Sequence, residues 1–231
     1  MNKYLQIIID WAEVWALLIP LLVYYIYKPK AAWTKPLKLY LAIAFLINFT
    51  GNIIWYRLKL GIGDWMYSNF SYFYNADGAF DNTILYNLHS VIRFLFFVWF
   101  FNYLNKVFKK LNLVIPAMFL LMFFTTFVFY KDIREFSSFL LGTEAALLLV
   151  YCLTYYLLLL KDEESSIKKS PHFWTVTGLS IYVVINFPIF LFYNVLAKQA
   201  ENFAVNIWDI HNISYLVLCL FIAKSFYAAK Q

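Results

Sequence analysis

Ionisable and amide side chains recur inside otherwise apolar stretches of this sequence, and they are the residues most able to do chemistry. A charge at the centre of a bilayer costs at least about 2.5–3.5 kcal/mol, so each such residue needs a partner or a function. Acids and histidines gathered in one place could bind a cation, hold a metal ion or share protons. The set comprises Asp10, Glu13, Asn48, Asn52, His89, Arg93, Glu144, Asn186, Asp209, His211 and Asn212.

Spacing along each helix indicates which of these side chains can meet. His89 and Arg93 are four residues apart and therefore share one helical face. Asp209 and His211 are two residues apart, and two steps turn a helix by about 200°. We therefore expect one of these two to face a neighbouring helix and not a pocket.

The charges within the apolar stretches do not balance. Asp10, Glu13, Glu144 and Asp209 are acidic, whereas Arg93 is the only basic residue of the polar set other than histidine, so full ionisation leaves a negative excess in a medium of low dielectric. Protonated carboxyls, charged histidines, a metal ion or a cationic ligand could each compensate. We expect Arg93 to pair with Glu144 or Glu13, because all three lie about 12–15 Å from the outer ends of their helices.

This polar cluster has three interpretations. It could be a structural network that fixes helix order. It could bind a zinc ion that activates water, with His89, His211, Glu144 and Asp209 as candidate ligands. It could also line a ligand pocket in the outer half of the bundle. The candidate pocket residues are Glu13, Asn52, His89, Arg93, Glu144, Asn186, Asp209, His211 and Asn212. None of them is assigned as catalytic.

The elements that carry these residues are predicted from composition and length. The 231 residues are 63% hydrophobic and only 14% charged, whereas a soluble domain is roughly 45–50% apolar and about 25% charged. A membrane helix needs roughly 20 mostly apolar residues. Seven stretches meet that length, which predicts an all-α bundle of seven transmembrane helices forming one domain. They are 5–27, 37–58, 83–104, 112–130, 136–160, 172–195 and 203–228.

The distribution of basic residues predicts the orientation. Loops enriched in Lys and Arg stay in the cytoplasm. The N-terminus is therefore expected outside and the C-terminus in the cytoplasm of a multi-pass inner-membrane protein. The net charge of +6 then reflects contact with anionic lipid and not with nucleic acid. The basic residues expected at the cytoplasmic face are Lys28, Lys30, Lys35, Lys38, Lys106, Lys109, Lys110, Lys161, Lys168, Lys169, Lys224 and Lys230.

Short motifs in three helices carry a family resemblance. They are the run 170–174 (SPHFW) followed by Gly178 and Tyr182, the run 208–212 (WDIHN), and the run 35–38 (KPLK). The chain resembles an uncharacterised bacterial family of seven-transmembrane-helix proteins that stand alone or precede sensor histidine kinases. The resemblance implies a signalling input module. It also implies an acid in the third helix, where this chain has Arg93.

Function is predicted from these features together. The first expectation is a small membrane receptor or signalling module that passes a signal from an outer-half pocket to a separate partner, such as a histidine kinase. The chain has no phosphate-binding loop or kinase signature of its own, so an effector must be a separate protein. The alternatives are a metal-dependent intramembrane hydrolase that acts on lipid, and a small transporter.

Overall fold

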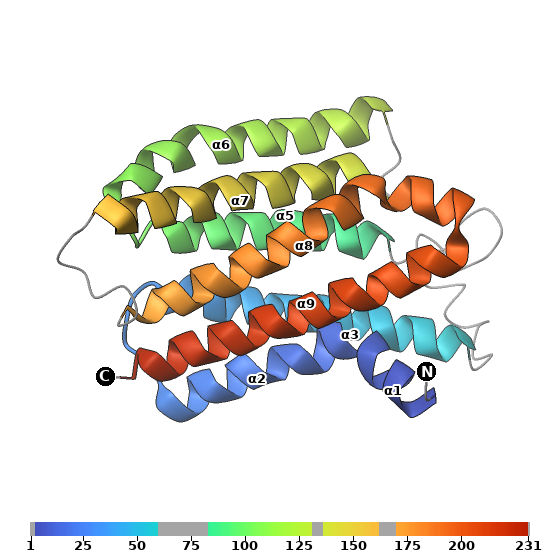
Figure 1. Cartoon of the computed structure of the whole chain (residues 1–231), viewed down its shortest axis with the longest axis horizontal. Helices are drawn as coiled ribbons and strands as arrows, with labels where there is room; N and C mark the ends of the chain where they lie inside the picture. The colour runs from blue at the N-terminus through green and yellow to red at the C-terminus, as the bar shows by residue number, and fades with distance from the viewer. Residues whose placement is uncertain (1–2, 60–82, 131–135, 162–169, 231) are drawn as a thin grey trace.

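The computed structural model describes residues 3–59, 83–130, 136–161 and 170–230, and these residues are helical apart from short connections. The helices are α1 (Lys3–Asp10), α2 (Ala12–Tyr27), α3 (Thr34–Lys59), α5 (Thr83–Phe101), α6 (Lys106–Thr125) with a π-helical turn η2 (Thr126–Tyr130), α7 (Ser138–Lys161), α8 (Pro171–Gln199) and α9 (Glu201–Ala228). They lie roughly side by side in one bundle (Figure 1). The prediction of an all-helical chain is confirmed for this part.

Six of the described helices are long and apolar enough to cross a membrane. These segments are Thr34–Ile53, Thr83–Phe101, Val107–Phe129, Ser138–Lys161, Pro171–Gln199 and Asn206–Ala228. Burial supports the same conclusion, because Leu113 and Phe129 on α6 and η2 are 80% and 75% exposed while Glu144 is 1% exposed. Apolar side chains outside and polar side chains inside are what a bilayer requires. The chain is a multi-pass membrane protein.

Six helices form a closed ring, and one lies outside it. Around the ring, α2 packs on α3, α3 on α5, α5 on α7, α7 on α8, α8 on α9, and α9 on α2. Helix α6 packs along the outer side of α5 and α7, and it lies at the upper edge of the view in Figure 1. Among its described side chains only Phe108 and Phe119 are fully buried. The polar residues predicted as a cluster lie on ring helices, except for Asp10, which is the last residue of α1.

The N-terminal segment departs from the prediction of one helix over 5–27. The helix is interrupted at Trp11, whose backbone (φ −95°, ψ 6°) leaves the α-helical region. Two carbonyls at this break accept side-chain donors, Ile8 from the Trp15 indole at 2.8 Å and Ile9 from the Asn212 amide at 3.2 Å. The break is therefore stable because tertiary contacts satisfy its backbone. Helix α2 has 16 residues and spans only about 24 Å.

Helix α6 begins six residues before the predicted start at 112. Its first turn carries Lys106, Lys109 and Lys110, so hydropathy does not mark it. The side chain of Asn105 accepts the backbone N–H of Val107 at 3.0 Å and caps the helix there. Such a cap stabilises the first turn independently of hydrophobicity.

Candidate functional site

The most buried charges in the bundle form a bidentate ion pair between α5 and α7. Arg93 donates from Nε to Glu144 Oε1 at 2.6 Å and from Nη2 to Oε2 at 2.7 Å. Ser90 adds a third hydrogen bond to Glu144 Oε2 at 2.6 Å. Paired charges of this geometry are tolerated in a low dielectric because nearly every donor and acceptor is satisfied. The prediction that Arg93 pairs with Glu144 or Glu13 is confirmed for Glu144.

Helix α8 completes the environment of Arg93. Arg93 Nη1 donates to the hydroxyl of Tyr182 on this helix at 2.5 Å. The guanidinium carbon also lies 5.0 Å from the ring centre of Tyr182 and 5.9 Å from that of Phe190. Cation–π contacts of this kind stabilise a guanidinium that has lost its water. Arg93 therefore connects α5, α7 and α8.

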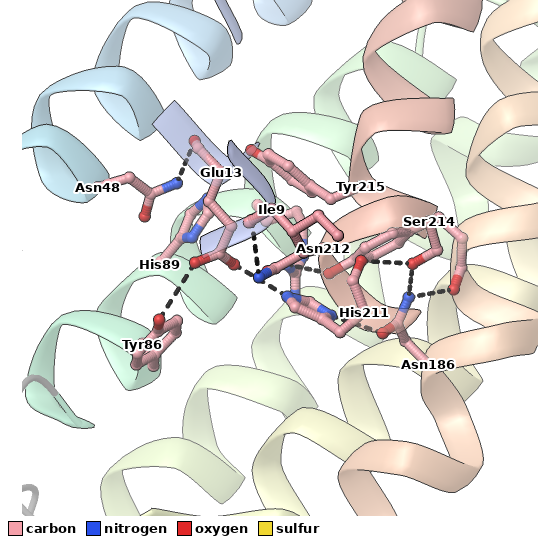
Figure 2. Close-up of polar contacts among 12 residues, drawn as sticks. Ile9, Glu13, Asn48, Tyr86, His89, Asn186, His211, Asn212, Ser214 and Tyr215 are labelled. Atoms are coloured by element: carbon pink, nitrogen blue, oxygen red, sulfur yellow. Dashed lines mark hydrogen bonds and ion pairs between the residues drawn. The ribbon is translucent and has the colours of Figure 1, made fainter. Parts of the chain in front are cut away.

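A second buried pair joins α2 to α9. Glu13 Oε1 lies 2.9 Å from His211 Nε2, and its other oxygen accepts the Tyr86 hydroxyl at 3.1 Å. The opposite ring nitrogen of His211, Nδ1, lies 2.5 Å from the side-chain oxygen of Asn186 on α8. Figure 2 shows this chain of contacts running from Tyr86 through Glu13 and His211 to Asn186.

The protonation of this second pair follows from its hydrogen bonds. Asn186 donates to the backbone carbonyl of Tyr182 at 2.7 Å, and a carbonyl can only accept. The amide oxygen of Asn186 is thereby turned toward His211, so Nδ1 of the imidazole must carry a hydrogen. The contact between Nε2 and Glu13 then needs one proton, on either the imidazole or the carboxyl. The pair is neutral in both cases.

His89 lies beside these pairs but belongs to neither. Its Nε2 is 3.4 Å from the Tyr40 hydroxyl, which in turn lies 3.1 Å from the Tyr215 hydroxyl. Together with Arg93, His211 and Glu13, it borders a cavity of about 10 Å³. That volume is room for about one water molecule.

A larger cavity of about 480 Å³ opens at the end of the bundle where α8 ends and α9 begins. Glu13, Asn52, Asp209 and Asn212 line it, as the pocket hypothesis expects, and Asp10 also does. A volume of this size suits a small-molecule ligand. The amide of Asn52 donates to the Asn48 carbonyl at 3.0 Å.

The predicted set therefore separates into two layers. Glu13 belongs to both, because it lines the 480 Å³ cavity and contacts His211. The deeper layer contains His89, Arg93, Glu144, Asn186 and His211, all buried. Asp209 is not in that layer, and its Oδ1 instead accepts from the Gln6 amide at 3.1 Å. As expected from their spacing, Asp209 and His211 face different surroundings.

The charge imbalance is resolved in the deep layer but not at the cavity. The Arg93–Glu144 and Glu13–His211 pairs are each neutral. The negative excess that remains belongs to Asp10 and Asp209. In the deep layer, Arg93 and His211 compensate the charges of the two acids. The charges of the two cavity acids remain to be explained.

The candidate zinc ligands do not come together. In the described ranges, no group of three or more His, Cys, Asp or Glu side chains is placed to hold one ion. Glu144 is occupied by Arg93, His89 contacts Tyr40, and Asp209 lies at the cavity. Each candidate ligand therefore has its own partner or surroundings, which helix faces alone could not reveal.

Tyrosine and serine partners were missed by the sequence reasoning. Tyr182 contacts Arg93, Ser90 contacts Glu144, and Tyr86 contacts Glu13. With 19 tyrosines in the chain, residue type alone does not single these out. Spacing could have done so, since Ser90 precedes Arg93 by three residues and therefore shares its helical face.

Two other residues have local roles. Ser170 precedes α8, and Pro171 is its first residue, a position that suits proline. The Ser170 side chain does not cap the helix and instead contacts the His172 ring at 2.7 Å from Nε2. Cys152 and Cys219 are both free and buried in the core.

Comparison of this chain with protein-family models, with curated proteins and with solved structures finds no match.

Proposed function

We propose that the chain is a small membrane receptor or signalling input module whose 480 Å³ cavity receives the ligand. In this proposal it crosses the inner membrane seven times, with α1 and α2 together as the first crossing. The N-terminus and the cavity face outward, and the C-terminus is cytoplasmic. The partner is a separate signalling protein, for which the family resemblance suggests a histidine kinase.

One observation carries the proposal: the cavity wall is part of a polar network that reaches all six ring helices. Glu13 on α2 lines the cavity and contacts His211 on α9. His211 contacts Asn186 on α8, which bonds to the backbone of Tyr182.

The network continues from there to the remaining helices. The hydroxyl of Tyr182 contacts Arg93 on α5, and Arg93 pairs with Glu144 on α7. Asn48 on α3 donates to the backbone carbonyl of Glu13 at 3.0 Å. A ligand that moves or repolarises Glu13 thus acts on hydrogen bonds that hold every ring helix, which is the kind of element that allostery requires.

The charge of the opposite end supports the orientation and the partner. Exposed lysines there include Lys35 at the start of α3, Lys161 at the end of α7, and Lys224 and Lys230 near the C-terminus. A basic rim is typical of the cytoplasmic side. It also suits contact with anionic lipid or an acidic surface of a partner.

The test measures whether cavity binding moves the basic end. Nitroxide labels are attached at Lys35→Cys and Lys161→Cys in protein whose two native cysteines are replaced by alanine, and the protein is placed in lipid nanodiscs. A library of amines, carboxylates, alcohols and sugars is screened for thermal stabilisation. Each compound that stabilises the protein is then examined by the spin–spin distance between the two labels.

A receptor is expected to show a distance change with at least one stabilising compound. Glu13→Gln should weaken that change, whereas the matched control Thr154→Ala should not, because the Thr154 hydroxyl bonds only to its own helix at Val150. Stabilising compounds that leave the distance unaltered would refute the proposal. So would turnover of the compound by the protein, or its transport into proteoliposomes.

A further inference from the structure

The two acids that remain unbalanced, Asp10 and Asp209, meet at one point of the cavity. The Gln6 amide nitrogen donates to Asp10 Oδ1 at 2.8 Å and to Asp209 Oδ1 at 3.1 Å. The two oxygens therefore lie within about 6 Å of one another and share a single neutral donor group. In the described ranges neither carboxylate has an ion-pair partner.

A buried acceptor on a residue that lines the same cavity lacks a donor. Asn212 is 3% exposed, and its amide nitrogen is committed to the Ile9 carbonyl at 3.2 Å. Its side-chain oxygen has no hydrogen-bond partner in the part of the chain that the structure describes. A buried amide oxygen without a donor is costly, and its partial negative charge adds to that of the two carboxylates at this part of the cavity.

Aromatic rings form another part of the lining. Tyr86 and Tyr193 contact the Trp208 ring at 5.4 and 5.0 Å between ring centres, and Phe136 contacts Tyr193 at 4.9 Å. All four line the cavity. A continuous aromatic wall gives dispersion contacts to an apolar or aromatic ligand body and a negative π face to a cation.

We propose that the cavity binds a small primary amine in its ammonium form, with the ammonium at Asp10 and Asp209 and its apolar body against the aromatic wall. An ammonium has three donors and no acceptor, which suits two carboxylates that share one neutral amide. Two carboxylates also exclude anions. The inference rests on the proposed function in that it names the ligand class of the same cavity.

The probe is 2-phenylethylamine, and its control is 2-phenylethanol, which keeps the skeleton but replaces the ammonium by a hydroxyl. Binding to the full chain in nanodiscs is measured by isothermal titration calorimetry, with empty nanodiscs subtracted to remove partition into lipid. The amine should saturate with one site per chain. The alcohol should bind about ten- to a hundredfold more weakly, as expected for the loss of a charge-assisted hydrogen bond.

Three variants test the assignment. Asp209→Asn should weaken amine binding by about tenfold or more, and Gln6→Lys should abolish it because a tethered ammonium then occupies the acids. Asp162→Asn, an acid that follows the opposite end of α7, is the matched control and should bind like the wild type. Equal affinity for amine and alcohol would overturn the inference, as would wild-type affinity of both Asp209→Asn and Gln6→Lys.

The two proposals fail in different ways. If carboxylates or sugars change the distance between the labelled helix ends and the amine does not bind, the receptor proposal stands and the amine assignment is wrong. If the amine binds with the expected variant pattern but no compound alters that distance, the amine site stands and the receptor proposal is wrong.

Discussion

Removing one partner of the Arg93–Glu144 pair should destabilise the bundle more than removing both. Glu144 is 1% and Arg93 4% exposed, and Glu144 accepts three hydrogen bonds of 2.6–2.7 Å. Glu144→Ala leaves a guanidinium buried without its counter-ion, which costs about 3–5 kcal/mol in the free energy of unfolding. Arg93→Met leaves the Glu144 carboxylate buried without its counter-ion and should cost a similar amount.

The double variant Arg93→Met/Glu144→Leu carries no buried charge. Apolar replacement of a whole buried pair is often close to neutral. Two hydroxyls, those of Ser90 and Tyr182, lose a partner, and each lost hydrogen bond costs about 1 kcal/mol. The double variant should therefore lose only about 1–2 kcal/mol.

The assay is equilibrium unfolding in mixed micelles with a rising fraction of sodium dodecyl sulfate, followed by the far-ultraviolet circular dichroism of the helices. Asp209→Asn is the control, because Asp209 is only partly buried, and it should stay within about 0.5 kcal/mol of the wild type. Single variants that each cost less than about 1 kcal/mol would refute the reasoning, as would a double variant as unstable as the sum of its singles.

Three more predictions use the same unfolding assay or a labelling experiment. Glu13→Ala should cost more than about 2 kcal/mol because His211 loses its partner, whereas Glu13→Gln can still hydrogen-bond and should cost less than about 1.5 kcal/mol; equal losses would contradict this. Gly178→Ala should cost about 1–3 kcal/mol, since the added Cβ would lie 2.4 Å from Phe221 Cβ, while Gly142→Ala, with its nearest atom at 3.5 Å, should be neutral or stabilising by up to about 1 kcal/mol. Both cysteines should resist a maleimide until the protein is unfolded, because their side chains are buried; mass spectrometry that finds rapid labelling of folded protein would exclude such burial.

The helices were predictable because a bilayer imposes a length and an apolar composition on each crossing. The Arg93–Glu144 contact was predictable for a related reason, since a charge at that depth needs an opposite charge at the same depth. Both arguments use only the position of each residue along its own helix.

What could not be predicted depends on how the helices are arranged around one another. The packing order does not follow from the sequence, so it was not predictable which of Asp209 and His211 faces the cavity, or that His89 and Glu144 have different partners. The interruption at Trp11 was hidden for a similar reason, because the donors that stabilise it include Asn212 on the last helix. At Trp11, tertiary contacts override the local helix propensity.

The position of α6 outside the ring has a consequence for how the chain is threaded through the membrane. Helices α5 and α7 are neighbours in the ring and run in the same direction (Figure 1). A chain that leaves the end of α5 must return to the opposite face before α7 can begin, and in lipid only a helix can make that return. The parity of the crossings thus depends on α6 even though the ring closes without it. Changes on the lipid-facing side of α6 leave this role intact, whereas loss of α6 would reverse the membrane orientation of every helix that follows.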